Sequence, residues 1–294
     1  MFSNLPNGIE AQVEPRHHCL DHEVRDHAES RALSSTIELS ASLPPAYCQR
    51  PYHVDGCRRV AGVPFLLDPV SSGHSLNSKN PYKLAHARHF EGVLYMQLKD
   101  LQRSEAAAAQ AMTLSTQHDF LYIRDEARVV LGRTRAQLDQ TNQAVSVIHQ
   151  GLSDRIKNGS RADITFFLMF LAEAQMLYRN IDEALITIED ALEANPEEFV
   201  YRPLLLNCRG DLRRQLEQAD LAEDDFREAV SLAKKMNAKA VELRAATSLV
   251  RLLQSRGAYT AARDLLAPLY GWFTEGFDTA DLKEAKALLE DLNK

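Results

Sequence analysis

Residues 172–196 read AEAQMLYRNIDEALITIEDALEANP. The small residue Ala172 lies in a first helical segment, and Ala184 follows twelve positions later in a second segment, beyond the turn Arg-Asn-Ile-Asp. Pro196 closes the stretch, because proline lacks the backbone N–H donor and does not continue a helix. The stretch therefore predicts two helices joined by a short turn.

The same spacing recurs along the chain at intervals of 38 to 40 residues. The small position in the first helix of each unit is occupied by Gly92, Gly132, Ala172, Gly210 and Val250. The position twelve residues later is occupied by Ser104, Ala144, Ala184, Ala222 and Ala262. A bulkier residue follows four positions on in most units: Ala108, Ile148, Ile188, Phe226 and Leu266. A fixed period over five units is the signature of a helical repeat array.

Small residues have a physical role in such units. Two antiparallel helices approach to about 8–10 Å only where the crossing point carries small side chains. We expect Gly or Ala of the first helix to face Ala of the second, and the bulkier residue to fill the groove toward the next unit. A single unit cannot bury its apolar face alone, so the stacked interfaces stabilise the array.

These positions resemble the tetratricopeptide pattern, in which small, aromatic and alanine residues are followed by proline. The period is longer than the usual tetratricopeptide value of about 34 residues and overlaps the lengths of HEAT and armadillo repeats. The recurring pattern of small residues nevertheless favours the tetratricopeptide fold. We predict an all-α, tetratricopeptide-like solenoid of about five helix pairs over residues 82–294. A capping helix is expected from Thr279 to about Leu292, and Trp272 is expected to help seal the end of the solenoid.

Residues 1–81 differ in composition from the rest. Eight of the eleven prolines lie at or before Pro81, so we expect an irregular, poorly ordered N-terminal region that precedes the repeat domain. Its histidines and cysteines, including Cys48 and Cys57, are of the types that bind zinc, but their spacing fits no common zinc site. No metal and no cofactor are therefore predicted. A metal-assisted enzyme or zinc-binding module in this region is the alternative.

Composition excludes several other classes of function. A net charge of −7 argues against a nucleic-acid partner, because such proteins usually carry a concentrated basic face. No apolar run approaches the roughly 20 residues needed to span a bilayer, and the first residues lack the features of a signal peptide. We expect a cytoplasmic protein that binds neither nucleic acid nor membranes.

The concave face of a tetratricopeptide array is lined by the first helix of each pair. Fixed offsets from the small position select the residues that face it. The candidate partner-binding residues are Glu126, Arg133, Met169, Glu173, Met176, Asn207, Asp211, Arg214, Arg244, Thr247 and Arg251. Arg214, Arg244 and Arg251 could form a cationic strip that grips a carboxylate or an acidic segment. The alternative is that these arginines pair with Asp211, Glu242 or other acids on a solvated helix face.

Catalytic residues are not predicted. The chain contains neither the Gly-x-Ser-x-Gly elbow of a nucleophilic serine nor a P-loop for nucleotide phosphates. His86 and His89 lie three residues apart on the first repeat helix and could bind a metal as a pair, although solvated or groove-lining histidines are more expected.

Two further segments carry a second resemblance: ELRAATSL at residues 242–249 and LLAPLYGWFTEGFDTADLKEA at 265–285. They resemble the extreme C-terminus of large bacterial signalling proteins. In these, a class III adenylate or guanylate cyclase domain, or another output domain, precedes an AAA-type ATPase and a tetratricopeptide-like tail. The resemblance is specific over about residues 200–290. It implies a non-catalytic interaction or regulatory module whose concave groove holds a protein, a peptide or a small effector.

Overall fold

The computed structural model describes residues 79–139, 143–160, 163–194 and 199–293. These residues form eleven α-helices and no strand. The predicted irregular region and its zinc alternative fall almost wholly on residues 1–78, outside the described part of the chain. No helix in the described part is long and apolar enough to cross a membrane.

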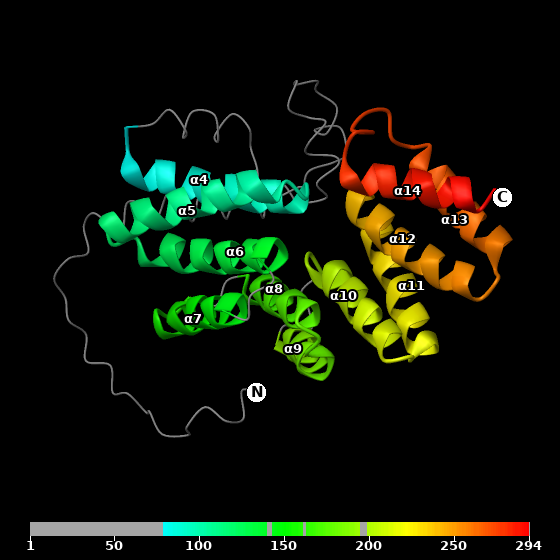
Figure 1. The fold of residues 1–294 in the computed structure, drawn as a ribbon, viewed down its shortest axis with the longest axis horizontal. Helices are drawn as coiled ribbons and strands as arrows, with labels where there is room; N and C mark the ends of the chain where they lie inside the picture. The colour runs from blue at the N-terminus through cyan, green and yellow to red at the C-terminus, as the bar shows by residue number, and fades with distance from the viewer. Residues whose placement is uncertain (1–78, 140–142, 161–162, 195–198, 294) are drawn as a thin grey trace. The chain divides into compact units, whose positions relative to one another are not determined.

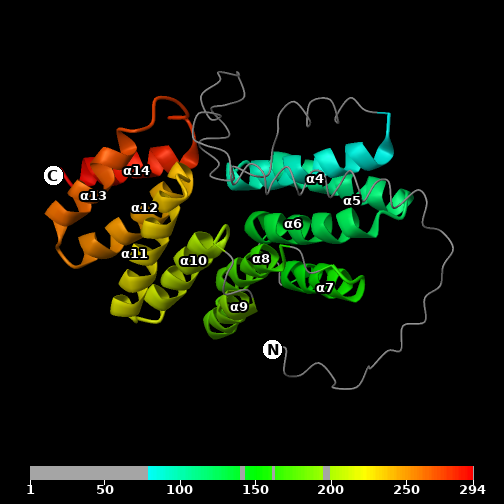
Figure 2. The same ribbon diagram turned by 180° about the vertical axis from the view of Figure 1, so that it is seen from behind.

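Ten of the helices form five consecutive pairs, and an eleventh follows them (Figures 1 and 2). The pairs are α4 (Pro81–Gln97) with α5 (Leu101–Gln117), α6 (Leu121–Asp139) with α7 (Gln143–Lys157), α8 (Ile164–Leu177) with α9 (Ile181–Ala194), α10 (Arg202–Gln215) with α11 (Ala219–Lys235), and α12 (Lys239–Ser255) with α13 (Tyr259–Tyr270). The last helix is α14 (Ala280–Asp291), which contacts α12 and α13. The predicted all-α array of five pairs with a C-terminal helix is confirmed.

Short turns and side-chain caps set the limits of the helices. Asn80 caps α4 by accepting hydrogen bonds from the backbone nitrogens of Tyr82 (2.9 Å) and Lys83 (3.3 Å), and Pro81 occupies the first helical position. The turn after α4 reverses the chain through Lys99, whose φ of 61° lies in the left-handed region. Such a residue ends a helix because it cannot continue the right-handed spiral.

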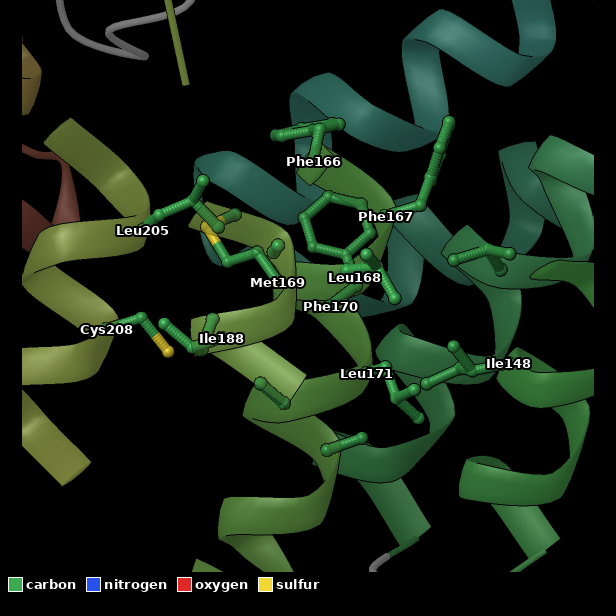
Figure 3. Packing of buried hydrophobic residues seen from close by; sticks show 14 of the residues in the cluster. Ile148, Phe166, Phe167, Leu168, Met169, Phe170, Leu171, Ile188, Leu205 and Cys208 are labelled. Atoms are coloured by element: carbon green, nitrogen blue, oxygen red, sulfur yellow. The ribbon is translucent and has the colours of Figure 1, made fainter. Parts of the chain in front are cut away.

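Helix α8 lies at the centre of the larger core. Ten of its fourteen residues are buried, because it contacts α6, α7, α9 and α10. Figure 3 shows its side chains beside Ile148 of α7, Ile188 of α9 and Leu205 of α10, all members of one buried cluster. A helix that is apolar on all sides is expected to be buried on all sides.

The predicted structural positions lie at the contacts between paired helices. All of them are buried: Gly92, Gly132, Ala172, Gly210, Ala144, Ala184, Ala222 and Ala262. The bulkier residue has a different role from the expected one. A Cβ atom added to Gly210 would lie 2.4 Å from a ring carbon of Phe226, and one added to Gly132 would lie 2.7 Å from Ile148. These bulkier residues therefore cover the glycine of their own pair, and do not only face the next unit.

This contact predicts that Gly210→Ala destabilises the protein by about 1–3 kcal/mol, because the fully buried ring of Phe226 must move. An Ala in place of Gly inside a helix would otherwise stabilise it by about 1 kcal/mol. Gly92→Ala is a milder comparison, since its nearest contacts would be 3.2–3.4 Å, which are tight but lack the overlap at Gly210. Urea unfolding of both variants checks this, and equal stability of the two would contradict the close-contact argument.

Candidate partner-binding groove

A cavity of about 160 Å³ is lined by residues from all five first helices, α4, α6, α8, α10 and α12. Its lining consists of Met96, Gln97, Lys99, Arg133, Gln137, Met169, Glu173, Met176, Leu204, Asn207, Cys208, Asp211, Val241 and Arg244. A second cavity of about 180 Å³ shares four of these residues and adds Thr247, Ser248, Arg251, Asp281 and Glu284. We call the two together the groove.

Helical periodicity explains why these residues share one surface. On α8 the lining residues are Met169, Glu173 and Met176, which are spaced four and three positions apart. Side chains at this spacing lie on the same face of a helix. The same rule brings Asn207 and Asp211 of α10 to the groove. Helices α8 and α10 therefore each contribute residues of one face to the groove.

The structure brings most of the predicted site residues together. The groove contains Arg133, Met169, Glu173, Met176, Asn207, Asp211, Arg244, Thr247 and Arg251. Arg214 is outside this lining, with its guanidinium 3.8 Å from the Asp211 carboxylate. Glu126 is also outside it, because it is buried in a separate ionic network. That the groove residues contact a partner stays a prediction.

Two buried polar atoms in the groove have no hydrogen-bond partner. Arg133 of α6 uses its Nε to donate to Glu173 Oε2 at 2.8 Å, but its Nη1 donor is unpaired. Asn207 of α10 has an unpaired Oδ1 acceptor. Buried polar groups in folded proteins are nearly always paired, so each exception needs an explanation. Here the two residues that carry the unpaired donor and the unpaired acceptor line the same cavity.

At one end of the groove, the first and last helix pairs are in contact. Arg244 of α12 donates to Asp281 Oδ2 of α14 at 2.6 Å, to Gln97 Oε1 at 2.6 Å and to the Gln97 carbonyl at 2.8 Å. Lys99 Nζ lies 3.0 Å from Asp281 Oδ1. Arg251 pairs with Glu284 of α14. The alternative expectation, that the arginines pair with Asp211, Glu242 or other acids, therefore holds for all three: Arg214 pairs with Asp211, whereas Arg244 and Arg251 pair with acids of α14.

Burial and nearby charges shift the pKa of three acidic groups in the groove. Burial raises the pKa of Asp211 to about 6, and the nearby Arg214 and Arg251 only partly oppose it. Burial also acts to raise the pKa of Asp281, but Arg244 and Lys99 outweigh it and hold the pKa below its usual value. Burial raises the pKa of the Cys208 thiol well above its ordinary range. Because the thiolate is the reactive form, this shift disfavours nucleophilic chemistry at Cys208.

Glu126 belongs to a buried network outside the lining of the groove. Its Oε1 accepts a hydrogen bond from Arg155 Nη1 at 2.6 Å, and its Oε2 lies 3.3 Å from His89 Nε2. The guanidinium of Arg155 lies over the rings of Tyr122 (4.7 Å) and Phe167 (4.9 Å). The expectation of a solvated or groove-lining histidine is wrong for His89, which is 2% exposed. Among the residues that the structure describes, no group of three or more His, Cys, Asp and Glu could hold a metal ion.

This network predicts a specific loss of stability in acid. Burial, with a contribution from Arg155, lowers the pKa of His89 to about 3, below its ordinary value of 6.5. A depressed histidine pKa favours folding above pH 6.5, and this contribution is lost as the pH falls toward 3. At pH 4.5 the loss is about 2–3 kcal/mol, since each pKa unit corresponds to about 1.4 kcal/mol. In His89→Gln the difference between the free energies of unfolding at pH 7 and pH 4.5 shrinks by this amount. The same difference in both proteins would contradict the argument.

Solved structures with a similar fold are repeat proteins. The structure of NprR in complex with its cognate peptide NprX has a TM-score of 0.61 at 12% identity, over 92% of this chain and 83% of that one. A Rap protein complexed with competence and sporulation factor has a TM-score of 0.54 at 13% identity, over 75% and 67%. BtubC from P. vanneervenii has a TM-score of 0.51 at 17% identity, over 66% and 89%.

These likenesses confirm the tetratricopeptide-like fold. No protein-family model matches the sequence, and no curated protein matches it significantly.

Proposed function

We propose that the groove binds a short peptide segment of a partner protein, and that the chain acts without catalysis. The observation that carries this proposal is that Arg133 and Asn207, which line one cavity, each carry a buried polar atom without a hydrogen-bond partner, the Nη1 donor and the Oδ1 acceptor. The main chain of a peptide offers a carbonyl acceptor and an N–H donor at every residue other than proline. Leaving a buried polar group unpaired costs about 1–3 kcal/mol, and a peptide toward which these two side chains turn would recover this cost.

The volume of the first cavity favours single side chains of a peptide over a compact drug-sized molecule. Pockets for drug-sized ligands usually enclose about 300–1,000 Å³, whereas the first cavity encloses about 160 Å³. A space of this size suits one or two side chains of an extended segment. Met96, Met169 and Met176 give this cavity a flexible apolar lining. We infer that the peptide inserts an apolar side chain among these methionines.

The complexes of similar structures agree with this proposal. NprR was solved with its cognate peptide, and Rap with competence and sporulation factor. At 12% and 13% identity these likenesses show the fold alone, so the proposal depends on the groove residues of this chain.

The experiment is a selection of random dodecapeptides on phage against the immobilised full chain. The affinity of each enriched peptide is then measured by fluorescence anisotropy. Asn207→Ala should weaken binding about tenfold, because the peptide loses a buried hydrogen bond. Arg133→Lys should also weaken it, because lysine keeps the charge but lacks the planar fork.

The matched control is Arg227→Lys on α11, where the arginine side chain is 56% exposed and pairs with Glu223. This variant should bind as the wild type does. No enriched peptides, or equal weakening in the control, would count against the groove. Thermal unfolding of each variant shows whether a loss of binding is a loss of the fold.

We also infer that the chain is the partner-sensing module of a cytoplasmic signalling system in bacteria. The support is the resemblance of residues 242–249 and 265–285 to the tails of cyclase–ATPase proteins. Cell fractionation tests the location, and recovery of the chain with membranes would contradict it.

A further inference from the structure

Three cationic side chains gather where the first and last helix pairs meet. Lys99 lies in the turn after α4, and Arg244 and Arg251 lie on α12. The two arginines are seven residues apart, which places them about 10 Å apart along one face of the helix. All three residues line the second cavity of the groove.

Two carboxylates of α14 form ion pairs with these cations. Asp281 lies 2.6 Å from Arg244 Nε and 3.0 Å from Lys99 Nζ. Glu284, one helical turn further on, pairs with Arg251 and lies 3.4 Å from Lys99. The helix therefore presents an acidic pair to the groove, as an acidic peptide would.

Apolar contacts hold α14 in place independently of this pair. Leu282 and Ala285 are buried in the cluster that α14 shares with α12 and α13. The acidic side chains can therefore change partners while the helix stays docked.

The ion pairs at this end differ in strength. The Asp281 side chain is only 9% exposed and Arg244 is used in three hydrogen bonds, so this contact is firm. The side chains of Lys99 and Arg251 are 50% and 45% exposed. Exposed ion pairs contribute little to stability, because water and other ions compete with them. An incoming carboxylate can therefore form ion pairs with Lys99 and Arg251 before it reaches Arg244.

We propose that Lys99, Arg244 and Arg251 form a carboxylate-binding subsite of the groove, and that Asp281 and Glu284 fill it as a built-in competitor of an acidic peptide. This inference rests on the proposed peptide-binding function. An acidic ligand pairs first with the exposed Lys99 and Arg251 in place of Glu284, and replaces Asp281 at Arg244 last, which loosens the contact between the first and last helix pairs. Asp211 of α10 also lines this end, so the ligand keeps one acidic neighbour.

The test compares the wild-type chain with the variant D281N/E284Q in the same dodecapeptide selection. The variant should enrich peptides richer in Asp and Glu and bind them at least about tenfold more tightly than the wild type does. Adding Arg251→Gln to this variant should remove the gain. The matched control is E275Q/E290Q, which makes the same change in charge at exposed positions outside the groove lining.

The outcomes separate this inference from the proposed function. If wild type and D281N/E284Q enrich peptides of the same charge and bind them equally, the subsite is overturned while peptide binding stands. If neither protein enriches any peptide, the proposed function itself is contradicted. Should D281N/E284Q fail to fold, Glu284→Gln alone leaves the Arg244–Asp281 contact in place, and an unchanged affinity for acidic peptides would then overturn the subsite.

Discussion

Arg155→Met lowers the free energy of unfolding by about 3–5 kcal/mol. The Arg155 side chain is fully buried, and its guanidinium neutralises the Glu126 carboxylate at 2.6 Å. Methionine fills much of the same volume but leaves this carboxylate in an apolar site without its cation. Removing one partner of a buried ion pair is costly for this reason, even where the intact pair contributes little.

Urea unfolding of matched variants separates the charge effect from the loss of packing. In the double variant Arg155→Met/Glu126→Gln no buried charge is left alone, so much of the stability should return. Arg135→Met removes the arginine of a pair whose side chains are 45% and 35% exposed, and it should cost at most about 1 kcal/mol. Equal losses in Arg155→Met and Arg135→Met would contradict the buried network.

Phe170→Ala destabilises the protein by about 3–5 kcal/mol, because it opens a cavity at the centre of the larger core. The Phe170 side chain is 1% exposed, and its ring lies 4.4 Å from that of Phe166 between ring centroids (Figure 3). Helix α8 is packed on several sides, so its neighbours cannot close the gap by small shifts. Urea unfolding measures this effect. The midpoint should fall, while the slope of the free energy of unfolding against urea concentration should stay the same.

The control for Phe170→Ala is Phe199→Ala, at a side chain that is 54% exposed. That change should shift stability by less than about 1 kcal/mol, as surface substitutions usually do. A small effect at both positions would contradict the central place of α8.

The repeat array was predictable because its signal is local. The spacing from Ala172 to Ala184 reflects one helix–turn–helix unit, and the same chemistry recurs in the other units. The offsets that select Arg133, Glu173 and Asn207 are also local, since they follow from the period of one helix. The contact of Phe226 with Gly210 was missed, because spacing alone does not show which side a bulky residue covers.

The rest of the site depends on contacts between distant residues. Gln97 and Arg244 are 147 positions apart, and no periodicity shows that the first and last pairs meet. Asp281 and Glu284 lie on the helix expected only to cap the array. Glu126 has the offset of a groove residue, but its partner Arg155 draws it into a buried network. Burial of an ionic pair depends on packing from several helices, which one helical period does not contain.

Photo-crosslinking tests most directly whether a peptide binds in this groove. A peptide enriched in the selection would carry a benzophenone in place of its apolar side chain, and mass spectrometry would locate the crosslinks on the full chain. We predict crosslinks to the methionines of α4 and α8, with competition by the unlabelled peptide and loss in Asn207→Ala. Crosslinks confined to the second helices α5, α7, α9, α11 and α13 would contradict the account.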